Sequence, residues 1–157
     1  MKNIARTAGA VAAGLLATVA FTGSAQAQTT TVQIHTADNQ AMHALNSTTL
    51  VPRARVLGQN RQRFVRRNAA SGFATYESVQ FPGRCITVNS RNSGERLRLA
   101  ACQNGNRRQL WSQGFGSGLF KKFENLDSLR TATIENGAIV QRIDTGLNAQ
   151  RWRVRIG

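Results

Sequence analysis

Acidic residues, histidine, cysteine and aromatic residues are all scarce in this sequence, and their scarcity narrows the chemistry open to it. The 157 residues include 7 Asp and Glu, 2 His and 2 Cys, and aromatic residues make up 6%. Two cysteines allow one disulfide bond at most, and with two histidines they leave little material for a metal site. The carboxylates and histidines stand in no spacing typical of a catalytic site. We therefore predict no catalytic residue, no bound metal and no cofactor.

Long apolar runs are also rare, and the one that exists lies near the N-terminus. Lys2 and Arg6 precede an apolar run over residues 7–21, and residues 24–27 (SAQA) offer an A-x-A cleavage site. The run of about 15 residues is shorter than the roughly 20 that span a bilayer. We predict a signal peptide over 1–27, cleaved after Ala27, and a secreted mature chain over 28–157. The alternative is a retained N-terminal anchor. No second apolar run predicts a transmembrane segment.

The mature chain is strongly basic. Without Lys2 and Arg6, the 21 Lys and Arg fall to 19, which against 7 Asp and Glu gives a net charge of +12. Guanidinium groups suit phosphate, sulfate and carboxylate partners, although the codon bias of a GC-rich genome would produce the same excess of Arg. A field of this sign concentrates polyanions. Aromatic residues are not interleaved with the Arg residues, so specific nucleic-acid recognition is not predicted.

Alternating apolar and polar residues predict short β-strands along the whole mature chain. Such runs occur at 31–35, 96–99 and 151–156, and turn-rich segments separate them at 68–72, 89–94 and 114–118. Period-two alternation is typical of strands with one buried face. Many short strands between turns indicate an all-β barrel or sandwich. With 41% apolar residues, the roughly 130 mature residues are expected to form one folded domain.

Three Q-x-[WF] motifs divide the mature chain into repeats. They lie at 62–64 (QRF), 109–111 (QLW) and 150–152 (QRW), at intervals of 47 and 41 residues. A short apolar run before each motif predicts a strand, at 55–57, 97–99 and 138–140. Units of this size cannot bury an apolar face alone, so they predict one closed body of three pseudo-symmetric repeats. The repeats are placed at about 29–70, 71–116 and 117–157.

The second repeat carries a resemblance to a known family. Residues 83–88 (GRCITV), 97–102 (LRLAAC) and 109–111 (QLW) are similar to the G-K-C-L-D-V, V-Q-L-W-x-C and Q-x-W segments of a ricin B-type β-trefoil lectin domain. The resemblance implies a β-trefoil, with six strands in a barrel and six in a hairpin cap. It also implies a disulfide between Cys85 and Cys102, for which two free thiols or a metal pair are the alternatives. The structural core it implies consists of Gln62, Phe64, Gln109, Trp111, Gln150 and Trp152.

The same resemblance locates the family's sugar pockets, and here the sequence departs from the family pattern. In each repeat the family uses an Asp, an aromatic residue and an Asn. The Asp position is assigned to His43, Thr87 and Thr131, and the Asn position to Arg61, Arg108 and Ala149. The aromatic position is assigned to Leu57, Ala100 and either Gln141 or Ile143. We expect galactose-type sugars to bind weakly, and any ligand to contact His43, Arg61, Thr87, Arg108 or Thr131.

Three functions remain open at this stage. The first is a carbohydrate-binding module with degenerate or altered sugar pockets, for anionic glycans or cell-wall polymers. The second is a non-catalytic trefoil subunit or adhesion module that binds a co-secreted protein partner or an anionic surface. The third is a small basic enzyme such as a nuclease, in which His43 would act as base beside Arg61. The third lacks a catalytic spacing. We therefore predict a non-enzymatic, monomeric carbohydrate-binding protein.

Overall fold

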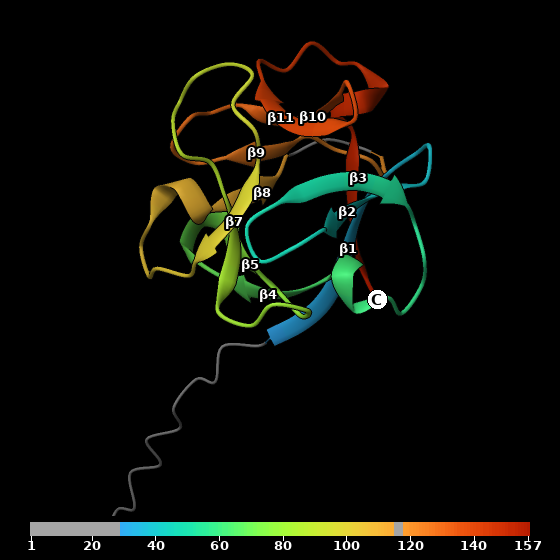
Figure 1. Ribbon diagram of the computed structural model, residues 1–157. Helices are drawn as coiled ribbons and strands as arrows, with labels where there is room; N and C mark the ends of the chain where they lie inside the picture. The colour runs from blue at the N-terminus through green and yellow to red at the C-terminus, as the bar shows by residue number, and fades with distance from the viewer. Residues whose placement is uncertain (1–28, 115–117) are drawn as a thin grey trace, which may run out of the picture.

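The computed structural model describes residues 29–114 and 118–157, and these residues form an all-β domain (Figure 1). The predicted signal peptide over 1–27 and the tip of the turn at 114–118 lie outside the described residues. Twelve strands are present: β1 (Thr29–Thr36), β2 (Gln40–Ala44), β3 (Leu50–Ala54), β4 (Arg63–Asn68), β5 (Phe73–Ser78), β6 (Arg84–Thr87), β7 (Arg98–Ala101), β8 (Trp111–Gln113), β9 (Phe123–Asn125), β10 (Thr131–Glu135), β11 (Ala138–Arg142) and β12 (Trp152–Ile156).

The strands pair as a closed barrel with a cap of hairpins. The barrel runs through β1, β4, β5, β8 and β9 by antiparallel pairing, and β12 pairs with β1. A bridge between Lys121 and Trp152 joins the start of the β9 segment to β12. The remaining strands form the hairpins β2–β3, β6–β7 and β10–β11. Six barrel strands and three hairpins are the β-trefoil arrangement, so the predicted fold is confirmed.

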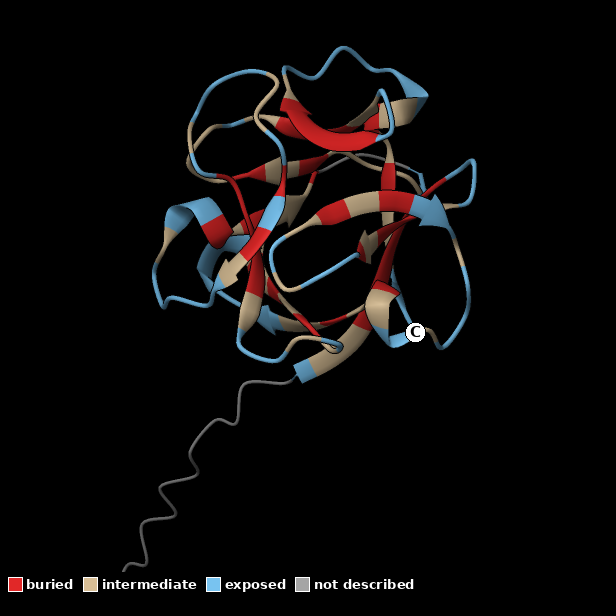
Figure 2. Ribbon diagram, in the orientation of Figure 1, coloured by how far each residue is buried: buried red, intermediate tan, exposed pale blue. Residues whose placement is uncertain are grey.

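Aromatic side chains fill the centre of the barrel. Phe64, Trp111 and Trp152 are fully buried, and the ring of Trp111 stacks on Phe123 with 5.0 Å between centroids. Each indole also finds a hydrogen-bond acceptor: Trp111 Nε1 donates to the Ile86 carbonyl at 3.0 Å and Trp152 Nε1 to the Ala132 carbonyl at 2.7 Å. Figure 2 shows the buried positions running along the strands while the loops stay exposed. Burial of these rings supplies much of the apolar driving force for folding.

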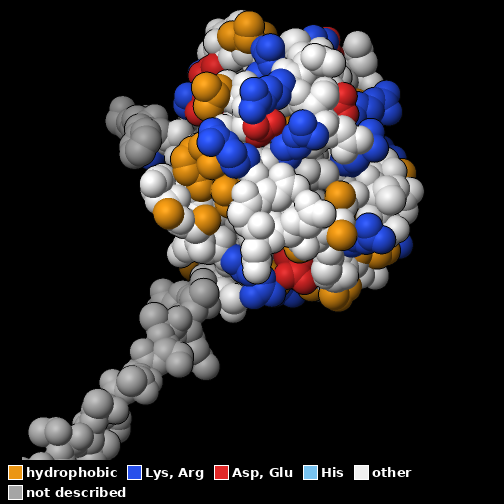
Figure 3. Space-filling view, turned by 90° about the vertical axis from the view of Figure 1, so that its left-hand side faces the viewer, with side chains coloured by type: hydrophobic (Ala, Val, Ile, Leu, Met, Phe, Trp, Pro, Cys, Tyr) orange, Lys and Arg blue, Asp and Glu red, His pale blue; other side chains and the backbone are white. Residues whose placement is uncertain are grey.

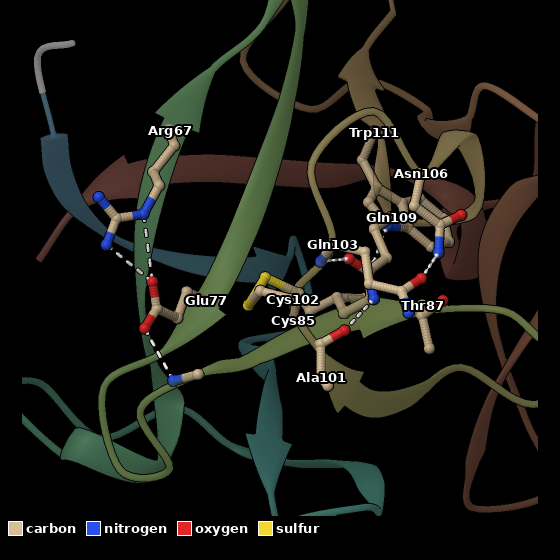
Figure 4. The surroundings of a disulfide bond; sticks show 12 residues. Arg67, Glu77, Cys85, Thr87, Ala101, Cys102, Gln103, Asn106, Gln109 and Trp111 are labelled. Carbon is tan, nitrogen blue, oxygen red and sulfur yellow. Dashed lines mark hydrogen bonds and ion pairs between the residues drawn. A yellow bond between two sulfur atoms is a disulfide. The ribbon is translucent and has the colours of Figure 1, made fainter.

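The glutamine of each Q-x-[WF] motif ties a loop to the barrel. Gln62, Gln109 and Gln150 end the short 3-10 turns η1 (Asn60–Gln62), η3 (Arg107–Gln109) and η4 (Asn148–Gln150), and all three side chains are buried. Gln109 Oε1 accepts from the Gln103 amide and Nε2 donates to the Ala101 carbonyl, both at 2.8 Å (Figure 4). Gln62 and Gln150 make the corresponding pairs of bonds. Each amide satisfies a backbone donor and acceptor that the strand ladders leave unpaired.

Cys85 and Cys102 form a disulfide bond, as the resemblance implies. Their Cα atoms are 5.0 Å apart, and the bond links β6 to the end of the β6–β7 hairpin (Figure 4). The Cys102 amide also donates to the Gly83 carbonyl at 2.9 Å. The disulfide therefore closes the hairpin that carries the second repeat's predicted pocket.

The expected strand at 55–57 is absent. The first hairpin ends at Ala54, and Arg55 and Val56 lead into the turn before η1. The Val56 amide donates to Gln62 Oε1 at 2.7 Å, so this residue belongs to the loop that Gln62 ties down. The corresponding expectations at 97–99 and 138–140 fall mainly on β7 and β11.

Candidate functional site

Two hollows occupy equivalent places in the second and third repeats. The repeat-two hollow has a volume of about 260 Å³ and the repeat-three hollow one of about 390 Å³. The repeat-two hollow is lined by Thr87, Val88, Asn89, Ala100, Ala101, Gln103, Asn106, Arg108 and Gln109. The repeat-three hollow is lined by Thr133, Ile134, Glu135, Arg142, Ile143, Thr145, Leu147, Ala149 and Gln150, with Ser93 from the second repeat.

The backbone register shows that the two hollows correspond residue by residue. Trp111 Nε1 donates to the carbonyl of Ile86, which directly precedes Thr87. Trp152 Nε1 donates to the carbonyl of Ala132, which directly precedes Thr133. Thr87 and Thr133 therefore occupy the same position in their repeats. By the same register Asn89 corresponds to Glu135, because each lies two residues further along. The hollows are thus two copies of one site, with different side chains.

The assignment of Thr131 to the Asp position is wrong. Thr131 corresponds to Cys85, two residues before Thr87, and it is fully buried in the barrel. Thr133 takes the expected place and lines the repeat-three hollow. The third repeat has no cysteine to mark the register, and it contains two threonines two residues apart. The sequence therefore offered no local signal that distinguished them.

The aromatic position also differs from the assignment in two repeats. Gln109 donates to the Ala101 carbonyl and Gln150 donates to the Ile143 carbonyl, so Ala101 and Ile143 occupy the same position in their repeats. The third-repeat equivalent of Ala100 is therefore Arg142, and neither Gln141 nor Ile143. Gln62 donates to the Ala54 carbonyl, which places Arg53, and not Leu57, at this position in the first repeat. Two guanidinium groups stand where the family has aromatic rings.

The repeat-three hollow combines a charged pair with an apolar rim. Arg142 donates through Nε and NH2 to one oxygen of Glu135, at 2.9 and 2.6 Å, and both side chains are 39% exposed. Ile143 and Leu147 are largely exposed beside them. The Thr133 hydroxyl accepts from Gln150 Nε2 at 3.2 Å. Glu135 was not predicted from the sequence. It lies two residues beyond Thr133, and the pairing of β10 with β11 places it in the hollow.

The repeat-two hollow brings together two predicted residues, Thr87 and Arg108. Arg108 NH1 donates to the Asn89 carbonyl at 2.6 Å, and its Nε donates to Asp127 at 3.3 Å. The Thr87 hydroxyl is held by backbone carbonyls, including that of Arg108, at 3.3 Å. Figure 4 shows Thr87 beside Gln109, on the far side of the hairpin from Glu77. This hollow is smaller, and no carboxylate lines it.

In the first repeat, His43 lies at the position that corresponds to Thr87, and Arg61 lies at the position that corresponds to Arg108, as assigned from the sequence. Arg61 NH1 donates to the Leu45 carbonyl at 2.5 Å, which is the same contact that Arg108 makes to Asn89. The Nδ1 atom of His43 is buried and has no hydrogen-bond partner among the described residues. The two predicted arginines thus share a structural contact, in which a guanidinium group binds the backbone at the end of a hairpin strand.

Both histidines have lowered pKa values, and they predict a pH-dependent stability. Burial lowers the pKa of His43 below its ordinary 6.5, and the charges of Arg61 and Arg53 lower it further. Burial also lowers the pKa of His35, where the Thr36 carbonyl acts in the opposite direction. The folded protein therefore binds fewer protons than the unfolded chain just below pH 6.5. Stability is complete above pH 6.5 and falls as the pH drops through the lowered values.

We expect the denaturation midpoint to fall between pH 7.5 and pH 5 and the fall to be smaller in His43→Gln and His35→Gln. Urea unfolding at several pH values measures this dependence. The carboxylates with lowered pKa values, Glu77, Asp127 and Asp144, have ordinary values of 4.5 or below, so they act at lower pH. Equal midpoints at pH 7.5 and 5 in the unmodified protein would contradict the prediction.

The described residues contain no group of three or more His, Cys, Asp or Glu side chains arranged to hold a metal ion. Within the same residues, no helix has the length and apolar character needed to cross a membrane.

Comparison with known proteins identifies the fold. No protein-family model and no curated protein matches the sequence. Among solved structures, the designed threefold-symmetric protein ThreeFoil matches with a TM-score of 0.71 at 17% identity, over 80% of this chain and 97% of its own. SeviL bound to asialo-GM1 saccharide matches with a TM-score of 0.64 at 14% identity, over 81% of this chain and 97% of its own.

An exo-β-1,3-galactanase from Clostridium thermocellum matches with a TM-score of 0.71 at 18% identity. The match covers 82% of this chain but only 30% of the galactanase, so this chain corresponds to one part of that enzyme. All three identities are low, and the likeness is one of architecture. The barrel, its three capping hairpins and these neighbours together show that the chain has the β-trefoil fold.

Proposed function

We propose that this protein is a non-catalytic carbohydrate-binding module whose main sugar site is the repeat-three hollow. The observation that carries the proposal is the Glu135–Arg142 pair, which lines the same hollow as the exposed side chains of Ile143 and Leu147. A sugar presents hydroxyl groups and C–H surface only. A carboxylate accepts from the hydroxyls, a guanidinium donates to the ring and hydroxyl oxygens, and the apolar side chains cover the C–H face.

The other two repeats are less suited to the same task. In the second repeat, Asn89 stands at the position of Glu135, Ala100 stands at the position of Arg142, and no carboxylate lines the hollow. In the first repeat, Leu45 stands at the position of Glu135, because Arg61 donates to its carbonyl as Arg108 does to that of Asn89. Neither repeat therefore offers a carboxylate at this position to accept from sugar hydroxyls. We therefore expect the repeat-three hollow to bind sugar more tightly than the sites that contain His43, Arg61, Thr87 and Arg108.

Two structural neighbours support a saccharide as the ligand class. SeviL is described in complex with the asialo-GM1 saccharide, and the Clostridium thermocellum protein is an exo-β-1,3-galactanase. The family's Asp and aromatic residues are replaced at all three pockets, so neutral galactose is expected to bind weakly. We further propose that the protein is exported, with residues 1–27 as the cleaved signal peptide.

The sugar site is tested by Glu135→Gln and Leu147→Ala. A glycan array first identifies a bound glycan, and calorimetry then measures its affinity for each variant. We expect Glu135→Gln to weaken binding about tenfold or more, because a hydrogen bond to a charged group contributes about 1.5–3 kcal/mol. Leu57→Ala is the matched control for Leu147→Ala, since Leu57 is 73% exposed and lies outside both hollows. Unchanged affinity in both site variants, or no glycan bound at all, would reject the proposal.

A second candidate function rests on a basic cluster at the junction of repeats two and three. Arg91 and Arg108 both contact Asp127, at 2.6 and 3.3 Å, and Arg91 holds the pKa of Asp127 below its ordinary value. Arg130 lies beside them, with its Nε donating to the Arg91 carbonyl at 2.8 Å. On the face of the molecule that Figure 3 draws, Lys and Arg side chains gather around acidic ones in the upper part.

Three guanidinium groups and one carboxylate leave a net positive charge in this cluster. Such a surface would hold an anionic polymer or an acidic co-secreted protein. Binding through this cluster would weaken steeply as the salt concentration rises, because exposed charges are screened. A heparin column tests this function separately from the sugar site. The variant Arg91→Gln should elute at a lower salt concentration than the unmodified protein.

A further inference from the structure

Two further hollows lie next to the repeat-three hollow. A bridging hollow of about 210 Å³ shares Glu135 and Arg142 with it and is also lined by Arg96 and Ala138. An axial hollow of about 290 Å³ shares Arg96 and Ala138 with the bridging hollow. Each neighbouring pair of hollows therefore has two side chains in common. The three hollows lie next to one another, and together they are called the groove below.

The axial hollow lies where the three capping hairpins meet. Its lining comes from Thr48–Val51 of the first hairpin, Arg96–Arg98 of the second and Gly137–Ala138 of the third. Backbone hydrogen bonds join the hairpins here: the Leu97 amide donates to the Ile139 carbonyl at 2.9 Å and the Leu99 amide to the Thr48 carbonyl at 3.0 Å. These two bonds join the second hairpin to the third and to the first beside the axial hollow.

A glycine makes room for the arginine between the first two hollows. Gly94 has a φ of +87°, and a Cβ added to it would lie 3.1 Å from Arg142 NH1. Arg142 also donates to Ser93 Oγ at 3.3 Å, so its guanidinium group is held between Glu135 and the 93–94 turn. A side chain at position 94 would strain the backbone at this positive φ and shift the guanidinium group by a few tenths of an ångström.

The groove carries more positive than negative charge. Its lining includes the guanidinium groups of Arg96, Arg98 and Arg142 but only one carboxylate, Glu135, which is already paired with Arg142. Arg98 has a long ion pair of 3.8 Å with Glu95, which does not line the groove. Arg96 is exposed and has no ion pair among the described residues. Two guanidinium groups beyond the first hollow are therefore available to a ligand.

We propose that this groove binds an acidic oligosaccharide, with one sugar in the repeat-three hollow and charged sugars beside Arg96 and Arg98. The inference rests on the proposed function and adds to it the charge and the length of the ligand. Guanidinium groups bind carboxylate and sulfate through paired N–H donors. Three connected hollows suit a chain of sugars better than a single one. The carboxylates of uronic acids and the sulfate esters of sulfated glycans share this chemistry.

The test compares ligand length and charge. Calorimetry at 150 mM salt uses tetrasaccharides of heparin, hyaluronan and polygalacturonate, together with their monosaccharides and their desulfated or methyl-esterified forms. We expect at least one acidic tetrasaccharide to bind tenfold or more tightly than its monosaccharide and than its neutral form. Preference for a sulfated or a carboxylated chain then distinguishes the two sources of negative charge.

Variants then place the ligand in the groove. Arg96→Gln and Arg98→Gln should each weaken the tetrasaccharide about tenfold and leave the monosaccharide unchanged. Arg84→Gln is the matched control, because it removes the same charge from a residue that lines none of the three hollows. Gly94→Ala should also weaken tetrasaccharide binding. Circular dichroism and the thermal midpoint check that each variant is folded.

The outcomes separate this inference from the proposed function. If Glu135→Gln weakens a bound sugar while Arg96→Gln and Arg98→Gln have no effect, the sugar site stands and the groove is rejected. If Arg84→Gln weakens binding as much as Arg96→Gln, the attraction is a general field and the groove is again rejected. If no acidic tetrasaccharide binds, the inference fails, whereas the proposed function fails if no glycan of any charge binds or if neither Glu135→Gln nor Leu147→Ala weakens binding.

Discussion

Trp152→Ala is expected to lower the free energy of unfolding by about 3–5 kcal/mol, as buried tryptophan truncations do. The side chain is fully buried in the barrel, and its Nε1 donates to the Ala132 carbonyl. Truncation leaves a cavity and removes the partner of that buried carbonyl. For a domain whose total stability is about 5–15 kcal/mol, the loss is a large fraction. Differential scanning calorimetry and urea unfolding measure it directly.

Trp152→Phe is the matched control for this prediction. Phe64 occupies the equivalent place in the first repeat and is fully buried, so the fold accepts a phenylalanine there. We expect a cost of about 1–2 kcal/mol, from the lost hydrogen bond and the smaller ring. A melting temperature that does not change in Trp152→Ala, with loss of glycan binding instead, would show that the indole serves the ligand and not the core.

Removal of the Cys85–Cys102 bond is the second change with a large expected effect. The bond closes a loop with a sequence separation of 17, and in the chain-entropy account such a loop is worth about 3 kcal/mol. Reduction of the native protein, or the variant Cys85→Ala/Cys102→Ala, should lower the urea midpoint accordingly. Mass spectrometry of the oxidised protein should find the two cysteines linked and no free thiol.

The disulfide also has a local consequence for the second repeat. Gln103 follows Cys102 directly, and its amide donates to Gln109 Oε1 at 2.8 Å. Loss of the bond should therefore increase hydrogen exchange at Gln103 more than at Thr145, its counterpart in the third repeat, which has no disulfide. Two alkylatable thiols in the native protein, or a midpoint that reduction does not change, would contradict the prediction.

The scaffold could be predicted because its signals are local and are repeated three times. The spacing of Gln62, Gln109 and Gln150 predicted three units, and the structure places all three at the ends of equivalent 3-10 turns. The segment around Cys85 was specific enough to suggest the β-trefoil and the disulfide. Strand prediction failed at 55–57, where an apolar pair belongs to a loop held by a glutamine side chain and not by a strand partner.

The binding site could be predicted only in part, because register is a property of strand pairing. His43, Thr87, Arg61 and Arg108 lie at the positions assigned to them. Thr131 does not, because the distance to the motif glutamine differs among the repeats: it is 19 residues from His43, 22 from Thr87 and 17 from Thr133. Only the hydrogen bonds of Trp152 and Gln150 fix the register of the third repeat. The same register brings Glu135 and Arg142 together, which their spacing in the sequence did not suggest.

The sequence by itself determined the all-β class and the threefold repeat, because each depends on residue type and spacing along the chain, and its resemblance to a known family implied the disulfide and the aromatic core. Only the tertiary structure decided which charges remain available to a ligand. Arg61 and Arg108 bind backbone carbonyls, whereas Arg96 and Arg98 face a groove formed by three hairpins that are far apart in the sequence. The availability of a guanidinium group depends on the acceptors that packing brings within hydrogen-bond distance, and those acceptors come from other strands of the fold.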